Sequence, residues 1–134
     1  MNDFKVEKDF MIGDYRCVIL GVPLGHRCGY VGLPKGHKYE NMDYDDLDVS
    51  VHGGLTYAGR YNKYPVDDDR SWIGFDCAHC GDGKDMKLIK ELTDERTYNH
   101  MVDMERMFPI REVVRTTEYV ENELIELVKQ LEEE

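Results

Sequence analysis

The sequence predicts an α+β domain with an antiparallel sheet of about five strands and one or two helices packed on one face. Short β-branched and aromatic runs, separated by glycine and proline, occupy the first part of the chain, up to residue 77. Helix-forming residues take over beyond Gly81. Residues 117–134 carry one apolar stripe at helical spacing, which needs a partner surface such as a sheet.

Five segments have the composition of strands, because β-branched and aromatic residues dominate them. The five expected strands are residues 14–22, 27–33, 47–52, 55–58 and 71–77. A short connection containing Pro23 and Gly25 separates the first two, which predicts that they form a hairpin. The polar stretch 34–46 lacks an apolar period and is expected to be a surface loop.

Residues 47–52 alternate apolar and polar side chains, which is typical of a half-buried strand with His52 on its polar face. If Gly53 and Gly54 form a two-residue hairpin turn, Tyr57 lies on the same face as His52. A glycine kink within one long strand is the alternative interpretation.

Two segments are expected to be helices. Residues 93–108 mix apolar and charged side chains and end before Pro109. The stripe of residues 117–134, which is expected to dock on the sheet, consists of Val120, Leu124, Leu127, Val128 and Leu131. Residues 118–134 contain seven Glu and one Lys, and this acidic helix should fray at its end because Glu opposes the dipole there.

Length and charge limit the class of protein. A chain of 134 residues is expected to form a single domain, residues 1–134. The net charge of -11 disfavours direct binding to nucleic acid and to anionic membrane surfaces. The sequence has neither an apolar run of about 18 residues nor a signal-peptide pattern. We therefore expect a cytoplasmic protein.

The cysteine content favours reduced thiols over disulfides. The run Cys77-x-His79-Cys80 has one CxxC spacing, which occurs in zinc sites. A closed zinc site needs four ligands, however, and no second paired cysteine motif follows. We expect no metal and no cofactor, and name Cys77, His79 and Cys80 as the ligands if a metal is present.

The sharpest candidate site is Asp76-x-x-His79-x-x-Asp82, directly after the last expected strand. Polar groups in such loops converge where binding and catalytic sites are commonly built, and His52 is their natural partner. These four residues could line a ligand-binding pocket. They could also bind a divalent metal that activates water, or provide a general base. The alternative is that they are ordinary turn residues beside glycine.

Arg27 is the best candidate for binding an anion, since it lies on an expected strand beside Cys28 and Gly29. Tyr57 and Trp72 could stack on the ring of the same ligand. The expected ligand-binding residues are Arg27, His52, Tyr57, Trp72, Asp76 and His79.

Residues 27–32 (RCGYVG), 51–57 (VHGGLTY) and 73–79 (IGFDCAH), with 115–120 (RTTEYV), resemble an uncharacterised family of small bacteriophage and prophage proteins. The likeness covers most of residues 14–134. That family has no assigned activity, so the resemblance implies a phage-type accessory protein in the cytoplasm of the bacterial host. It transfers no cofactor and no catalytic residue.

Three functional hypotheses follow. The leading one is a module that binds a small anionic, nucleotide-like ligand, which would suit a protein that counters host defence. The second is a metal-dependent hydrolase or phosphodiesterase with His52, Asp76, His79 and Asp82 as catalytic residues. The third is an acidic inhibitor that binds a host protein or imitates nucleic acid. The sequence does not predict an oligomeric state.

Overall fold

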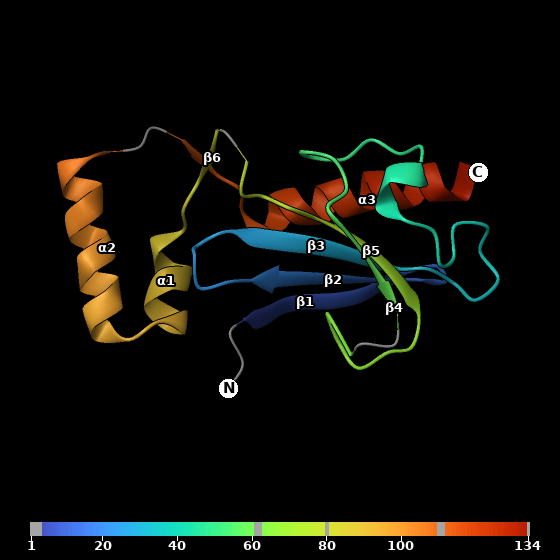
Figure 1. Ribbon diagram of the computed structural model, residues 1–134, viewed down its shortest axis with the longest axis horizontal. Coiled ribbons are helices and arrows are strands. Elements are labelled where there is room, and N and C mark those ends of the chain that lie inside the picture. Colours follow the sequence, from blue (N-terminus) through green and yellow to red (C-terminus); the bar gives the residue numbers. More distant parts are fainter. Residues whose placement is uncertain (1–3, 61–62, 80, 110–111, 134) are drawn as a thin grey trace.

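The computed structural model describes residues 4–60, 63–79, 81–109 and 112–133. A five-stranded antiparallel sheet has the strand order β1-β2-β3-β5-β4. Its strands are β1 (Lys5–Ile12), β2 (Tyr15–Gly21), β3 (Arg27–Gly32), β4 (Tyr57–Arg60) and β5 (Ser71–Asp76). Helix α3 (Thr117–Glu133) lies along one face of this sheet (Figure 1). The predicted α+β architecture is confirmed.

The predicted hairpin is also confirmed, because β2 and β3 pair in the register Arg16↔Gly32 to Gly21↔Arg27. The sheet nevertheless contains one strand that the sequence did not predict. This is β1, an edge strand with mostly exposed residues and a register shift between Val6 and Lys8. Its mixed charged and apolar sequence does not show the clean alternation of a strand with one buried face, so no pattern revealed it.

Residues 47–52 do not form a strand, contrary to the prediction. The Ser50 N–H donates to Oε1 of Gln130 at 2.6 Å, and the Ser50 carbonyl accepts from Nε2 of the same side chain at 2.7 Å. Gln130 belongs to α3. Its amide therefore satisfies backbone groups that a neighbouring strand would otherwise pair.

Neither alternative for Gly53 and Gly54, a two-residue hairpin or a kink within one long strand, is present, because no strand directly precedes them. The Gly54 N–H donates to the Val51 carbonyl at 2.9 Å, which closes a tight turn before the chain reaches β4 at Tyr57. A short 3-10 helix, η1 (Tyr44–Asp46), interrupts the segment that was expected to be a loop.

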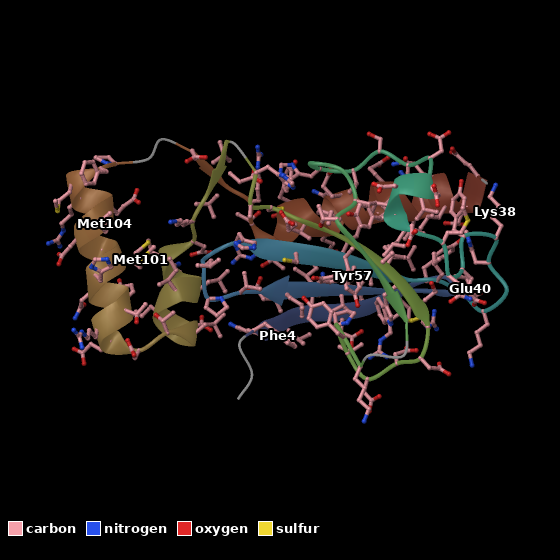
Figure 2. The ribbon with its side chains drawn as sticks, viewed as in Figure 1. Phe4, Lys38, Glu40, Tyr57, Met101 and Met104 are labelled. Atoms are coloured by element: carbon pink, nitrogen blue, oxygen red, sulfur yellow. The ribbon has the colours of Figure 1, made fainter. Side chains whose placement is uncertain are left out.

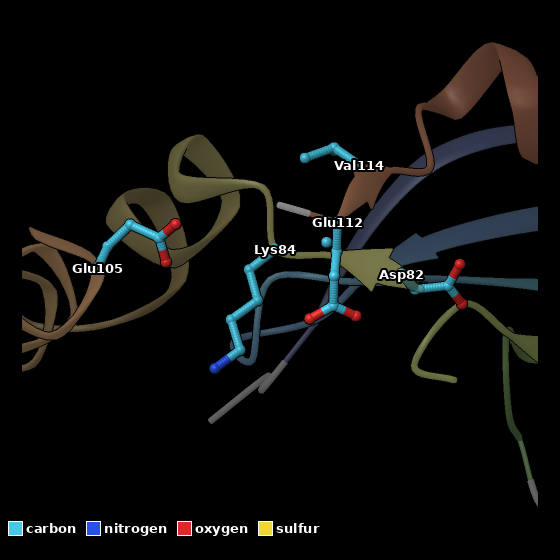
Figure 3. A pocket seen from close by; sticks show the side chains of 6 residues that line it. Asp82, Lys84, Glu105, Glu112 and Val114 are labelled. Carbon is cyan, nitrogen blue, oxygen red and sulfur yellow. The ribbon is translucent and has the colours of Figure 1, made fainter. Parts of the chain in front are cut away.

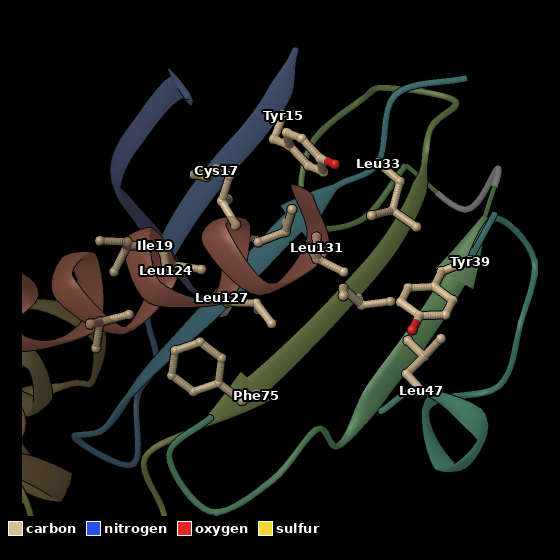
Figure 4. Close-up of a cluster of buried hydrophobic side chains, with 14 of the residues drawn as sticks. Tyr15, Cys17, Ile19, Leu33, Tyr39, Leu47, Phe75, Leu124, Leu127 and Leu131 are labelled. Carbon is tan, nitrogen blue, oxygen red and sulfur yellow. The ribbon is translucent and has the colours of Figure 1, made fainter. Parts of the chain in front are cut away.

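The apolar stripe of α3 is buried against the sheet, as predicted. All five of its residues are at most 1% exposed. They share one core with residues of β2, β3 and β5, among them Ile19, Val31 and Phe75 (Figure 4). Leu47, from the irregular segment, closes the same core.

A second, smaller core covers the opposite face of the sheet. It contains Val18, Leu20, Cys28, Tyr30 and Trp72, with Tyr57 and Tyr64 packed against it. Trp72 of β5 lies on this side, whereas Ile73 and Phe75 lie under α3.

The remaining elements form an extension that we call the helical arm, residues 82–115. Two short parallel strands, β6 (Asp82–Gly83) and β7 (Val113–Val114), form its base. They enclose α1 (Met86–Leu92) and α2 (Glu95–Met107), which project from one end of the sheet (Figure 1). Helix α2 packs against α1 and not, as expected, on the sheet. Within the described ranges, the helices are too short or too polar to cross a membrane.

Candidate functional site

The candidate site is centred on the carboxylate of Asp82, at the base of the helical arm. Its side chain is 1% exposed and accepts hydrogen bonds from three segments of the chain. The donors are Nε2 of His52 at 2.8 Å, Nε of Arg115 at 2.9 Å and the backbone N–H of His79 at 3.1 Å. Burial alone would raise the pKa of Asp82, but these hydrogen bonds outweigh it and lower that pKa. The carboxylate is therefore ionised at neutral pH.

The ionised carboxylate fixes the tautomer of His52. Because Asp82 only accepts, Nε2 of His52 carries the proton. In the neutral ring Nδ1 is then an acceptor, to which the Tyr119 hydroxyl, 2.7 Å away, can donate. The result is a continuous chain of hydrogen bonds from the Tyr119 phenol through the imidazole to a buried carboxylate.

Two charged groups flank this chain of hydrogen bonds. The guanidinium carbon of Arg115 lies 4.7 Å from the centre of the Tyr119 ring, so the cation covers one ring face. Glu123 accepts from the backbone N–H of His52 at 2.7 Å. Burial and the charge of Glu123 raise the pKa of Tyr119, so its hydroxyl is protonated at rest.

Asp76 and His79 form a more exposed pair beside His52. The two side chains are 31% and 34% exposed, and Nε2 of His79 lies 3.2 Å from Oδ1 of Asp76, outside hydrogen-bonding geometry. Gly53 lies directly against His79, since a Cβ on Gly53 would come within 2.2 Å of its Cδ2. Gly53 also has a φ of +67°, so glycine is required there for two reasons.

The structure does not leave Arg27 free to bind an anion. Its side chain is 8% exposed and pairs with Glu7 at 2.5 Å and Asp85 at 2.8 Å. It also donates to the Arg115 carbonyl at 3.1 Å. Two carboxylates therefore neutralise the guanidinium, which fastens the base of the arm to β3.

Tyr57 and Trp72 lie apart from His52, on the opposite face of the sheet. Trp72 is fully buried. The Tyr57 ring packs edge to face on Tyr30, with ring centres 5.5 Å apart. The prediction that Tyr57 shares a face with His52 is wrong, because residues 47–52 leave the sheet and turn toward α3. The expected binding residues thus separate into the His52, Asp76 and His79 group, the Arg27 ion pairs, and two aromatics of the smaller core.

The structure provides no metal-binding cluster in the part of the chain that it describes, where no three His, Cys, Asp or Glu side chains are placed to hold one ion. Cys77 is buried, and burial raises the pKa of its thiol to about 12. Cys80, the other cysteine of the CxxC spacing, lies outside the described residues.

A small cavity of about 120 Å³ adjoins Asp82 on the side of the arm. It is lined by Asp82, Gly83, Lys84, Glu105, Glu112 and Val114, and the Asp82 carboxylate points away from Lys84 and Glu105 (Figure 3). Pockets for ligands of nucleotide size measure about 300–1,000 Å³. This cavity is therefore too small for the ligand that the sequence led us to expect.

Sequence reasoning missed Tyr119 and Arg115. Both lie in the segment 115–120 that contributes to the family resemblance, but no spacing links them to His52, which is 67 positions from Tyr119. Only the docking of α3 brings them together. Comparison of the chain with protein-family models, with curated proteins and with solved structures found no match.

The Asp82 cluster should make stability sensitive to acid. A carboxyl whose folded pKa is lowered stabilises the fold above its unfolded pKa of about 3.9, and the contribution is lost as pH falls through the folded pKa. We expect the free energy of unfolding to fall less between pH 6 and pH 3 in Asp82→Asn than in the wild type. Urea titrations at each pH measure this. Equal losses in the two proteins would show that Asp82 is not the linked group.

Proposed function

We propose that this protein acts by binding another protein through the helical arm. The observation that carries this proposal is the exposure of α2, a 13-residue amphipathic helix that has no buried residue. Met104, Met107 and Phe108 are 41%, 66% and 62% exposed. Figure 2 marks Met101 and Met104 on this helix. Apolar side chains gathered on an exposed helix are typical of a binding face.

Exposed apolar residues are concentrated at this end of the described chain. The structure has nine exposed large hydrophobic residues within the described ranges, and six lie on or beside the arm. These six are Leu24, Met104, Met107, Phe108, Val113 and Val114. Leu24 belongs to the β2–β3 turn. This turn lies close to α1, as the short distance of 3.0 Å between a Cβ built at Gly25 and the Ile89 side chain shows.

Charge also favours the arm as the contact surface. Residues 82–116 contain eight acidic and seven basic residues, so nearly all of the net charge of -11 lies elsewhere in the chain. The arm is nearly neutral and projects away from the strongly acidic parts, which include η1 and the end of α3 (Figure 1). A partner can therefore approach it with little electrostatic repulsion.

The occupant that fits this surface is a different protein with a concave apolar groove that receives α2. A second copy of this chain fits this surface less well, because a symmetric pair of α2 helices would bury only one face of a 13-residue helix from each copy. Stable interfaces use about 20–30 residues from each partner. A groove surrounds a helix and buries more of it than a second helix does.

The site geometry favours this function over the binding of a small anion. Arg27 is neutralised by Glu7 and Asp85, and Trp72 is buried. If the phage resemblance holds, the partner is a host protein. The contact surface then differs from that of the acidic inhibitor which the sequence suggested, because the arm is nearly neutral.

Photo-crosslinking tests the proposal. A benzoylphenylalanine at Met107 should give an adduct with a second protein in cells, which mass spectrometry identifies. The same probe at Met11, an exposed methionine of β1 that is 52% exposed, is the control and should not give it. Calorimetry with the purified partner should then show that Phe108→Asp weakens binding at least about tenfold, or 1.4 kcal/mol, whereas Met11→Asp does not.

Three results would overturn the proposal. The first is that the probe at position 107 gives no adduct with a second protein beyond what the probe at position 11 gives. The second is an adduct only with another copy of this chain, which would make the arm a self-association surface. The third is a purified partner that binds wild type and Phe108→Asp equally well.

A further inference from the structure

We propose that Tyr119 is an activated nucleophile that accepts an acyl group from a neutral ester, with His52 as its general base. This activity is independent of the protein-binding role of the arm. It rests on the placement of Tyr119 and Arg115 beside His52 and Asp82, of which sequence reasoning had joined only His52 and Asp82.

The three side chains have the geometry of a nucleophile, a base and an orienting carboxylate. The Tyr119 hydroxyl lies 2.7 Å from Nδ1 of His52, and Nε2 of His52 lies 2.8 Å from Oδ2 of Asp82. Both distances are within the range that proton transfer requires. Asp82 holds the imidazole in the tautomer whose Nδ1 can accept the phenolic proton, which is the role of the carboxylate in hydrolytic triads.

The charges around the triad suit the attack step. As the Tyr119 oxygen bonds to the ester carbonyl carbon, its proton moves to Nδ1 of His52. The ionised Asp82 stabilises the resulting imidazolium. The alcohol then leaves with the proton from Nδ1, and the acyl group stays on Tyr119. Water, activated by the same nitrogen, can release it as a carboxylic acid and restore the phenol.

The raised pKa of Tyr119 is compatible with this step. A serine hydroxyl in a hydrolytic triad is likewise protonated at rest and loses its proton only during attack. Arg115, 4.7 Å from the ring centre, favours the negative charge that develops on the phenol as it reacts.

The local charge indicates the class of substrate. Asp82 and Glu123 contact His52. Asp76 pairs with His79, whose ring centre lies 6.0 Å from that of His52. Arg115 adds one positive charge to this group. An anionic phosphoryl donor would be repelled by this net negative charge, whereas a neutral ester would not. The inference therefore differs from the metal-dependent phosphodiesterase that the sequence suggested.

Acetylation by p-nitrophenyl acetate tests this inference in the intact wild-type protein. Peptide mapping by mass spectrometry gives the rate at each tyrosine. Tyr119 should be acetylated at least about 100-fold faster than Tyr44, because a positioned base contributes about that factor or more. Tyr44 is 40% exposed and serves as the reference for an accessible phenol.

Variants separate an activated phenol from a merely structural hydrogen bond. Tyr119→Phe should abolish the fast release of p-nitrophenolate. His52→Gln, if it melts cooperatively, should lower the acetylation of Tyr119 to the rate of Tyr44. The inference is overturned if Tyr119 reacts no faster than Tyr44 in the wild type, a comparison that requires no variant to fold. It is also overturned if folded His52→Gln retains the fast reaction.

Discussion

Leu124→Asp should remove a large part of the protein's free energy of unfolding and lower its melting temperature. Leu124 is fully buried in the core between α3 and the sheet. An aspartate there would place an unpaired charge among apolar side chains, which costs at least about 4 kcal/mol. Small domains are stable by only about 5–15 kcal/mol. Thermal and urea unfolding followed by circular dichroism measure the loss.

The matched control is Asn122→Asp, which adds the same carboxylate to the same helix at an exposed position. It should change the free energy of unfolding by no more than about 0.5 kcal/mol. If Leu124→Asp melted like this control, α3 would not be docked on the sheet through its apolar stripe.

The elements that the sequence predicted correctly are those specified by local patterns. The α3 stripe repeats with the helical period, and Pro23 and Gly25 mark the connection within the β2–β3 hairpin. The segment 47–52 has an equally regular alternation but is not a strand. A side chain 80 positions away, Gln130, pairs with Ser50, and such a long-range contact has no local signal.

The candidate site was predicted only in part, because some of its contacts join residues that are close in the sequence and others join residues that are far apart. His79 and Asp82 are close in the chain, and the structure does join them to His52. Arg27 was predicted to bind an anion, but its side chain is buried and a buried arginine needs partners within the protein. Its partners Glu7 and Asp85 come from β1, which was not predicted, and from the start of the arm, so an ion-pair cluster was mistaken for an anion site.

Arg27 and Asp82 together explain how the arm is attached. Asp82 begins β6 and pairs with Arg115, which follows β7, so it ties both ends of the arm to each other. Arg27 holds the same two ends to β3 through Asp85 and the Arg115 carbonyl. Residues expected to bind a ligand instead set the position of the surface proposed to bind a partner.

Arg27→Met should therefore destabilise the protein by about 3–5 kcal/mol, because it leaves two poorly exposed carboxylates without their cation. Their side chains, in Glu7 and Asp85, are 11% and 19% exposed. The control is Lys5→Met, which breaks a pair with Glu91 in which the two side chains are 43% and 50% exposed. Exposed pairs contribute little to stability, so the control should hardly change the free energy of unfolding.

The pH dependence of the Arg27→Met defect gives a second and sharper test. Burial alone would raise the pKa of Asp85, but Arg27 and the Lys87 N–H outweigh it and lower that pKa. This contribution is present above the unfolded pKa of about 3.9 and is lost as pH falls through the folded pKa. The difference in stability between wild type and Arg27→Met should therefore shrink on acidification from pH 6 to pH 3. Hydrogen exchange at pH 7 should also speed up in α1 and α2 of the variant more than in β2. A defect that stayed constant with pH, or that spread evenly over the sheet, would show that Arg27 does not act by anchoring the arm through these carboxylates.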